Sequence, residues 1–559
     1  MKKSTYVFLY FIVFWILIPG LLYYVSQLSD KYLFPGSRLI DATVIPGYIL
    51  GISGFLMLLL TLYQFRQFSG KFPVSATPPE KIILRGVFSV WRHPIYLFAS
   101  VMLIGISLII RSKALLFIVF PVFIILVVLY IIREEAILVK RFGDQYIKYR
   151  RNVPLLVPRL RHWLTIPGFV LLKSKFRIKV RNRENIPSSL PFIVISGHRH
   201  YLDPIIVSYA IPVPLIQIAT FEMFRSPLNR RLFKWFGAIP RKRFLKDFEG
   251  TQRILSTLRS GYPICMFPEG GRSWTGKIRP FKPESIKLLK HLRDIPVLPV
   301  RIEGNYHSWP RWANHMMKSD ITVTIQKPVS IDPDASVDDL GKTLRELVEP
   351  REEIERKIIC KGKNRIENLS KVIYRCPVCM NSDPPDEIIP DSLYCNKCKT
   401  RFLLRPDFSI DFMIGNTDKI ESIHSLYNRI KIKYSDIYNM LSEDLVNQYS
   451  GYVDQGDKLI YLSPCQLWTE TKNIFKMSIK GVCILSDKSV TVTDNEEILT
   501  IPLKDIGAAT IESNYKLQIY NEVIKVLYQL TFSRESALKY QDLLEVIIRE
   551  LYKRQIITR

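Results

Sequence analysis

Long apolar runs dominate the start of the chain. They cover residues 6–25, 45–65, 95–110 and 114–132, and only three residues separate the last two runs. A bilayer is crossed by about 20 apolar residues, so the runs reach or approach the length of a membrane span. No small-x-small cleavage site follows the first run, which argues against a signal peptide. The pattern predicts four transmembrane helices, the last two as a tight hairpin, rather than the buried bundle of a soluble protein.

The periodicity changes at about residue 165. Phe176, Ile178 and Val180 alternate with Lys and Arg, which is typical of a half-exposed strand. Short apolar runs predict buried strands at 191–196, 264–267 and 297–302, and helical patterns lie between them at 248–259 and 283–293. Strands that alternate with helices predict an α/β domain.

The last third of the chain has a third pattern. A charged, helix-prone connector leads into a cysteine-rich segment, and a polar stretch with helical character follows. Short alternating strands at 482–485, 490–492, 498–501 and 526–532 precede an amphipathic helix at 534–552. We therefore expect a multi-domain protein: a transmembrane domain, an α/β domain, a helical connector, a cysteine module, a helical linker region and a mostly β domain with a closing helix (1–165, 166–350, 351–373, 374–402, 403–470 and 471–559).

Charge narrows the choice of partners. The 559 residues carry 79 Lys and Arg against 51 Asp and Glu, a formal net charge of +28. Such an excess favours a polyanion, which is nucleic acid or an anionic membrane. Residues 140–183 hold thirteen Lys or Arg and one acid directly after the last apolar run, and no nucleic-acid motif accompanies them. We expect contact with membrane lipid and no nucleic-acid partner. The positive-inside rule places this side in the cytoplasm, in the style of a bacterial inner membrane protein.

A candidate acid-base pair follows the first buried strand of the α/β domain. His198 and Asp203 stand in Ser-Gly-His-Arg-His-Tyr-Leu-Asp-Pro, with four residues between them. A His can take the proton of an attacking hydroxyl, and a carboxylate on its other nitrogen fixes the tautomer. By itself this spacing is more often a turn His beside a capping Asp.

Three later segments change that judgement. Residues 237–243 read Gly-Ala-Ile-Pro-Arg-Lys-Arg, residues 267–273 read Phe-Pro-Glu-Gly-Gly-Arg-Ser, and residues 297–304 read Val-Leu-Pro-Val-Arg-Ile-Glu-Gly. Arg suits bidentate phosphate binding, and Gly lets backbone N–H groups approach an anion. Each segment is weak alone, but the four in this order are specific.

These four segments resemble the blocks of the glycerolipid acyltransferase family, whose members acylate glycerol 3-phosphate or lysophosphatidic acid. The resemblance implies that His198 is the general base and Asp203 its charge partner. It implies an acyl-thioester donor, which is acyl-CoA or acyl carrier protein, and it places Pro299 on the donor side. It further implies that Arg243 contacts the acceptor phosphate and that the third block binds the glycerol-phosphate part (Glu269, Gly270 and Arg272).

The first block departs from the family pattern. The family usually has Asn before the His and Ser two residues after it, whereas this chain has Gly197 and His200. The departure leaves the acid-base pair intact, but it leaves the identity of the acceptor undetermined. We expect His200 to be a spectator.

The apolar N-terminal part carries a second set of polar residues. Arg-His-Pro-Ile-Tyr precedes the third apolar run, and Glu134-Glu135 ends the fourth. These residues can be interface anchors. The set also resembles the membrane methyltransferases for isoprenylcysteine and phospholipids, which implies binding of S-adenosylmethionine at the matching positions (Arg92, His93, Tyr96, Glu134 and Glu135). The domain can also have kept the fold and lost the activity.

Four of the eight cysteines form two tight pairs. Cys376 and Cys379 are followed, after fifteen residues, by Cys395 and Cys398. Either pair alone could be a redox site, but two pairs at this distance have the spacing of a zinc ribbon with a closed tetrahedral site. We expect structural zinc and a reducing compartment.

The C-terminal strands and helix loosely resemble a pleckstrin-homology-like domain. Such a domain could bind lipid headgroups or a protein, or only pack against the α/β domain. The sequence as a whole favours a membrane O-acyltransferase of phospholipid synthesis. Two alternatives stay open: an S-adenosylmethionine-dependent methyltransferase with an accessory acyltransferase domain, and a non-enzymatic lipid-binding scaffold.

Overall fold

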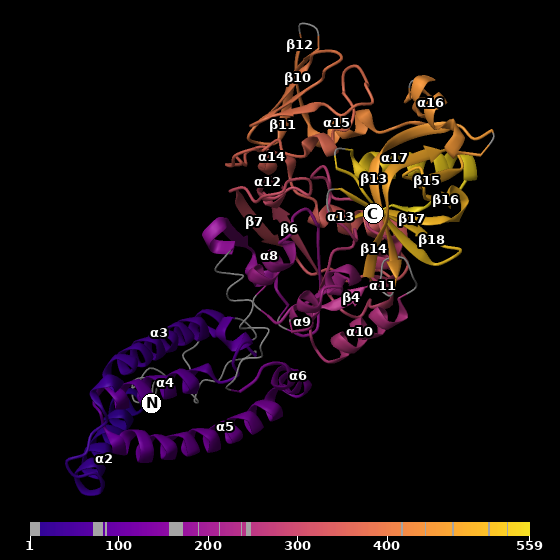
Figure 1. Ribbon diagram of the computed structural model, residues 1–559. Helices are drawn as coiled ribbons and strands as arrows, with labels where there is room; N and C mark the ends of the chain where they lie inside the picture. The colour runs from indigo at the N-terminus through magenta and orange to yellow at the C-terminus, as the bar shows by residue number, and fades with distance from the viewer. Residues whose placement is uncertain are drawn as a thin grey trace.

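The protein is divided into an N-terminal group of apolar helices and three β-sheets (Figure 1). The computed structural model describes residues 12–70, 82–83, 86–155, 172–187, 189–211, 213–235, 237–241, 247–414, 417–441, 443–454, 456–471, 474–512, 515–533 and 535–558. In the view of Figure 1, the N-terminal helices lie at one end and the C-terminal sheet at the other. The chain is therefore multi-domain, as its changing periodicity predicts.

The N-terminal helices are α2 (Ile18–Leu33), α3 (Val44–Ser69), α4 (Pro94–Ile109), α5 (Phe120–Phe142) and the short α6 (Asp144–Asn152). Among the described residues, two helical stretches are long and apolar enough to cross a membrane, 41–69 and 115–142, while α4 is shorter. Only 22% and 17% of their most apolar windows are buried, which is unlike a soluble core helix. The prediction of four spans is thus not confirmed, and the first predicted span begins outside the described residues.

Two expectations about these helices need correction. Glu134 and Glu135 do not end the fourth helix, because α5 continues to Phe142 and carries both carboxylates on its last turns. The first helix also runs past residue 25, to Leu33. The predicted tight hairpin between α4 and α5 is confirmed, and Asp30 of α2 caps it: Oδ1 accepts the backbone N–H of Ala114 at 2.8 Å.

The central sheet has seven strands in the order β1-β7-β6-β2-β5-β3-β4. β7 runs antiparallel to β6, and the other neighbours are parallel. The strands predicted at 191–196, 264–267 and 297–302 are confirmed within a residue or two, as are both predicted helices. Buried β-branched residues explain β2, where all four side chains are buried. The elements are β1 (Arg177–Arg181), β2 (Ile193–Ser196), α8 (Asp203–Ala210), β3 (Ile216–Thr220), α9 (Pro227–Trp235), β4 (Ile239–Arg241), α10 (Phe248–Arg259), β5 (Ile264–Met266), α11 (Pro283–His291), β6 (Val297–Glu303), α12 (Asn305–Ser308), β7 (Asp320–Ile325) and α13 (Val337–Val348).

The cysteine module belongs to a five-stranded antiparallel sheet in the order β12-β11-β10-β9-β8. Here two predictions are wrong. The connector 351–373 is mostly irregular and holds only the short α14 (Glu352–Glu355) and one 3-10 turn. The linker 403–470 is not wholly helical, because strands extend the sheet before its helices begin. The elements are β8 (Asp386–Ile388), β9 (Ser392–Tyr394), β10 (Arg401–Leu404), β11 (Ser409–Ile414), β12 (Thr417–Ser422), α15 (Ile423–Ile430) and α16 (Glu443–Tyr449).

The C-terminal sheet has eight strands in the order β16-β15-β14-β13-β19-β18-β17-β20, and α17 (Ala537–Tyr552) packs on it. It begins earlier than expected, since the long β13 starts at Leu459. The strands are β13 (Leu459–Thr471), β14 (Ile474–Ser486), β15 (Ser489–Thr493), β16 (Ile498–Pro502), β17 (Ile506–Glu512), β18 (Lys516–Asn521), β19 (Val526–Thr531) and β20 (Ile557–Thr558). A mostly β domain with a closing helix is confirmed, while likeness to pleckstrin homology stays a prediction.

One apolar core joins the central sheet's flank, the cysteine module and the C-terminal sheet. It contains Trp274 and Trp312 from the α/β part, Cys376 and Cys395 from the cysteine module, and Leu530 of β19. Separate cores fill the two faces of the central sheet. The three parts are therefore held together by buried apolar surface rather than by a linker alone.

Candidate active site

His198 and Asp203 come together just beyond the carboxyl end of β2. Nδ1 of His198 lies 3.0 Å from Oδ2 of Asp203, and the Asp203 side chain is fully buried while the His198 ring is 20% exposed. Asp203 thus keeps the proton on Nδ1, so Nε2 is the nitrogen available to take a proton from a substrate.

Asp203 is fixed by three further donors. Its Oδ2 accepts the backbone N–H groups of Arg199 and His200, both at 2.8 Å, and its Oδ1 accepts Nδ2 of Asn305 at 2.8 Å. Burial favours the neutral acid, but the hydrogen bond and charge of His198 outweigh it and hold the pKa of Asp203 below its usual value. The carboxylate therefore stays ionised beside the imidazole.

The His198 ring stacks on Phe267, which directly follows β5, with ring centroids 4.5 Å apart. Burial lowers the pKa of His198; Asp203 opposes this effect, and the guanidinium groups of Arg272 and Arg311 add to it. The imidazole is consequently neutral near pH 7, the form that a general base requires.

Glu269 ties two loops of the site together. Its Oε1 accepts the backbone N–H of His198 at 2.5 Å, and its Oε2 accepts the backbone N–H of Arg279 at 2.9 Å. The side chain is buried, and burial raises the pKa of Glu269 to about 8. Both oxygens face the main chain, so this carboxyl group positions the His198 turn.

Gly270 and Arg272 form the turn after Glu269. Gly270 has a φ of +72°, and a Cβ at this position would lie 1.8 Å from Nζ of Lys282, so only glycine suits the turn. The next residue but one, Arg272, has its guanidinium over the Tyr201 ring at 5.3 Å, and burial lowers its pKa. The Ser273 N–H donates to the carbonyl of His198 at 2.9 Å. Arg272 therefore stands beside the candidate base.

Two other residues of the predicted acyltransferase site, Pro299 and Arg243, are not seen beside His198. Pro299 is buried within β6, opposite Ile195 of β2, so it shapes the sheet beneath the site. Arg243 lies outside the described residues.

The departures in the first block have local structural reasons. A Cβ on Gly197 would lie 2.2 Å from Cδ1 of Ile278, so a larger residue requires Ile278 to move. His200 is buried between the rings of Phe176 and Trp309, each with a centroid 5.8 Å away. Its Nδ1 accepts the N–H of Leu202, and burial lowers the pKa of His200 to about 4. A neutral and tightly packed His200 is consistent with the prediction that this residue takes no part in acyl transfer.

A buried ion pair behind the site was not predicted from the sequence. Arg199 donates to both oxygens of Glu355, at 2.7 and 3.2 Å, and also to Oδ1 of Asn305. Asn305 in turn donates to Asp203, so the ion pair supports the Asp203 carboxylate through one amide. Burial opposes ionisation of Glu355, but Arg199 holds its pKa at about 2. Arg199 and Glu355 are 156 residues apart, a distance over which no motif spacing can be read.

The methyltransferase-like residues form a second polar cluster between the start of α4 and α5. Nη1 of Arg92 lies 2.9 Å from Oε1 of Glu135, and His93 lies 3.3 Å from both Glu134 and Glu135. The Tyr96 hydroxyl donates to Glu134 at 3.3 Å. The structure thus brings all five predicted residues together.

Two buried donors at this cluster have no hydrogen-bond partner among the residues that the structure describes. They are Nε of Arg92 and the hydroxyl of Tyr146, which is 2% exposed. An unpaired buried donor is costly, so such groups mark places where a polar ligand fits. A carboxylate or hydroxyl of S-adenosylmethionine has the required acceptors, and the residues present fit that cofactor.

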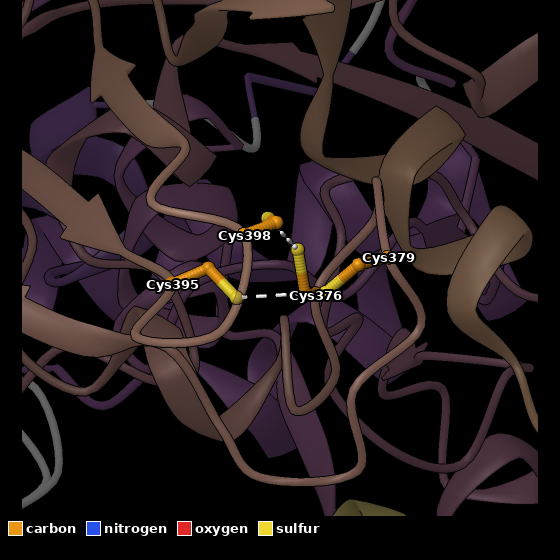
Figure 2. A group of neighbouring side chains, drawn as sticks. All are labelled: Cys376, Cys379, Cys395 and Cys398. Carbon is orange, nitrogen blue, oxygen red and sulfur yellow. Dashed lines mark hydrogen bonds between the residues drawn. The ribbon is translucent and has the colours of Figure 1, made fainter.

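The four paired cysteines gather in space (Figure 2). Sγ of Cys376 lies 3.5 Å from Sγ of Cys398, Sγ of Cys379 lies 3.7 Å from Sγ of Cys395, and all four sulfurs lie within 4.8 Å of one another. A tetrahedral zinc site with Zn–S bonds of about 2.3 Å requires S–S separations of about 3.8 Å. The cluster can therefore bind a metal ion.

Family models match two parts of the chain. Residues 177–303 match the acyltransferase family model, and residues 42–145 match the phospholipid methyltransferase family model. The chain thus carries an acyltransferase domain behind a phospholipid-methyltransferase-like domain.

Its relatives are acyltransferases of lysophosphatidic acid. A chloroplast 1-acyl-sn-glycerol-3-phosphate acyltransferase of Brassica napus is 25% identical over 33% of this chain and 52% of its own length. The enzyme of the same name from Borreliella burgdorferi is 30% identical over 20% of this chain and 46% of its own. A solved 1-acyl-sn-glycerophosphate acyltransferase from Thermotoga maritima covers 37% of this chain and 80% of its own length, with 25% identity and a TM-score of 0.30. The chain spans about half the length of these two sequence relatives.

Proposed function

We propose that this chain, which carries an acyltransferase domain, transfers a fatty acyl group from acyl-CoA or acyl carrier protein to the hydroxyl of a lysophosphatidic acid or glycerol-phosphate-type lipid. The observation that carries the proposal is the 3.0 Å contact between His198 and a fully buried Asp203 inside that domain. The relatives' names point to the same class of acceptor.

The chemistry follows from the two side chains. Nε2 of His198 takes the proton of the acceptor hydroxyl while its oxygen attacks the thioester carbonyl carbon. Asp203 stabilises the imidazolium that forms. When the intermediate collapses, the carbon–sulfur bond breaks, the ester forms, and the imidazolium returns the proton to the leaving thiolate. Arg272 binds the acceptor phosphate, and Gly270 lets the turn approach it; Arg243 is a further candidate for this role.

The test is an acyl-transfer assay with product identification. Detergent-solubilised protein is incubated with labelled acyl-CoA or acyl carrier protein, with lysophosphatidic acid or total membrane lipid, and the product is identified by mass. His198→Ala should reduce transfer by about 10² to 10⁴-fold, the usual contribution of a general base, and Asp203→Asn nearly as much. His200→Ala should have a mild effect. An inactive His200→Ala variant together with an active His198→Ala variant would show that His198 is not the base.

A second function is favoured by Nε of Arg92 and the hydroxyl of Tyr146, which have no hydrogen-bond partner within the described part of the chain. The N-terminal domain would bind S-adenosylmethionine, a methyl donor. Arg92 would bind the carboxylate of this cofactor, and Glu134 or Glu135 would bind its hydroxyls or amine. His93 and Tyr96 would hold the side chains of Glu134 and Glu135 in place. Calorimetry with S-adenosylmethionine on the solubilised protein tests this directly. No binding would mean that the domain is an anchor only.

The remaining parts have supporting roles in this proposal. The cysteine cluster holds structural zinc through Cys376, Cys379, Cys395 and Cys398. The protein lies in a bacterial inner membrane with both sites in the cytoplasm, and residues 140–183 follow the anionic lipid surface. The domains divide near residues 165, 350, 373, 402 and 470, and the last one is pleckstrin-homology-like.

A further inference from the structure

The turn that carries Arg272 is held by a segment outside the four acyltransferase blocks. This segment, residues 306–312, follows β6. Its Tyr306 hydroxyl donates to the carbonyl of Trp274 at 2.9 Å. Its Arg311 guanidinium lies over the Trp274 ring at 4.2 Å and donates through Nη1 to the carbonyl of Arg272 at 2.8 Å. Arg311 thus fixes the main chain at Arg272.

The same guanidinium reaches the C-terminal sheet. Nη2 of Arg311 donates to the carbonyl of Ile511 in β17 at 2.6 Å, 200 residues away along the chain. Arg311 is only 5% exposed, so these are charge-assisted bonds away from water, which are stronger than surface ones. One buried cation therefore joins the Arg272 turn to the C-terminal domain.

The position of this turn matters for the candidate site. The Ser273 N–H donates to the His198 carbonyl, and the Arg272 guanidinium stacks on Tyr201. A shift of the Arg272 main chain would move its guanidinium relative to His198. Both terminal nitrogens of Arg311 bind main-chain carbonyls, so Arg311 acts through Arg272 rather than on a substrate.

We propose that Arg311 is a positioning residue that sets Arg272, and that the C-terminal domain through β17 completes the acceptor end of the acyltransferase site. The inference rests on the proposed function, in which Arg272 binds the acceptor phosphate. It gives the C-terminal domain a part in acceptor binding.

Arg225 provides a control for the possibility that Arg311 only holds the two domains together. Arg225 also joins the two domains: its Nη2 donates to Oε1 of Glu470 in β13 at 2.9 Å, and its guanidinium lies over Phe475 of β14 at 4.6 Å. Arg225 makes no contact with Arg272 among the interactions of the described residues. Loss of Arg225 weakens the same domain contact and leaves the Arg272 turn in place.

The experiment measures steady-state kinetics of the full-length, solubilised protein with acyl-CoA and lysophosphatidic acid. Arg311→Ala should raise KM for lysophosphatidic acid about ten- to hundredfold, the effect of losing charge-assisted hydrogen bonds. KM for acyl-CoA should stay within about twofold. Arg225→Ala should leave both KM values within about twofold. Arg311→Lys should give a smaller rise in acceptor KM, since one ammonium replaces the guanidinium fork less well.

Each other outcome is decisive. A folded Arg311→Ala protein with wild-type acceptor KM would overturn the inference and leave the proposed function standing. Equal changes of acceptor KM in Arg311→Ala and Arg225→Ala would show that Arg311 only holds the two domains together, and would overturn the inference. If the Ala variant unfolds, the Lys variant decides by the same acceptor KM, and an unchanged value overturns the inference. A wild-type protein that acylates neither lysophosphatidic acid nor total lipid would overturn both proposals.

Discussion

Main-chain N–H groups hold the side chains of Asp203 and Glu269, the two acidic residues that contact the His198 segment. Asp203 accepts two backbone N–H groups of its own turn, and Glu269 accepts one from His198 and one from Arg279. The position of the imidazole thus depends on side chains that bind the backbone around it. Substitutions of these acidic residues should change the position of the imidazole. A positioning role can therefore be distinguished from direct contact with the acceptor.

Glu269→Gln tests that separation. An amide offers one acceptor oxygen where the carboxyl group offers two, so one backbone N–H would face an NH₂ group. We expect a loss of about 1–3 kcal/mol in unfolding free energy and a lower kcat with nearly unchanged acceptor KM. Thermal unfolding and steady-state kinetics measure both, with the exposed Glu249→Gln as control. A raised acceptor KM at unchanged stability would instead support the direct contact that the family resemblance implies.

The pH dependence of transfer has a definite sign. The base acts as neutral imidazole, so kcat/KM rises as pH increases through the pKa of His198. Burial and the neighbouring guanidinium groups hold that pKa below 6.5 despite Asp203. We expect the acid limb of the kcat/KM profile to have its midpoint below pH 6.5. A midpoint above pH 7 would contradict the neutral, buried imidazole.

At the scale of elements, glycine allows α3 and α4 to pack closely in the N-terminal domain. A Cβ on Gly105 of α4 would lie 2.2 Å from the backbone N of Gly51 in α3, whereas a Cβ on Gly51 meets its nearest atom, Cδ1 of Ile109, at 3.5 Å. Small residues at helix interfaces let backbones approach closely within a membrane. This contact packs α4 directly against α3.

These two glycines form a matched pair for mutation. Gly105→Ala should force α3 and α4 apart and cost about 1–3 kcal/mol, the usual effect of overpacking. Gly51→Ala should be tolerated, because its methyl group makes an ordinary contact. Thermal unfolding in detergent and calorimetric binding of S-adenosylmethionine report the difference. Equal stability of the two variants would show that α3 and α4 pack differently.

At the scale of the whole molecule, the shared apolar core joins metal binding to the stability of distant parts. Cys376 and Cys395 belong to the core that also contains Trp274 and the C-terminal sheet. Loss of metal should therefore spread beyond the cysteine module, since a broken structural site releases the core around it.

Metal analysis should find one zinc ion per chain. Cys376→Ser or Cys398→Ser should release it, lower the unfolding temperature and reduce acyl transfer. Cys360→Ser is the control, because this buried thiol packs on Met317 outside the cluster and should keep the metal. Iron in place of zinc, or full transfer activity in a metal-free protein, would contradict this coupling.

The two proposed sites should fail separately. Glu135 stands in α5 and His198 beyond β2, and no described contact links their side chains. Glu135→Ala should abolish binding of S-adenosylmethionine and leave acyl transfer within a few-fold, while His198→Ala should do the reverse. Calorimetry and the transfer assay are run on both variants. Loss of acyl transfer in a folded Glu135→Ala protein would indicate a single coupled site.

The sequence alone determined those features that depend on short-range order. Apolar periodicity located β2, β5, β6, α10 and α11, because a buried strand or an amphipathic helix needs only its own residues to show its pattern. The spacing His-x4-Asp and the two Cys-x-x-Cys pairs were readable for the same reason, since each group is made by one or two turns of chain.

Only the tertiary structure decided what depends on residues far apart. The strand β12, at the edge of the cysteine sheet, lies where polar sequence favoured helix, because pairing with its neighbour outweighs weak local preference. The Arg199–Glu355 pair joins residues 156 apart, and the hydrogen bond from Arg311 to Ile511 of β17 joins residues 200 apart. Their residues carry no local signal, since a buried cation is stabilised by whichever acceptors folding brings to it.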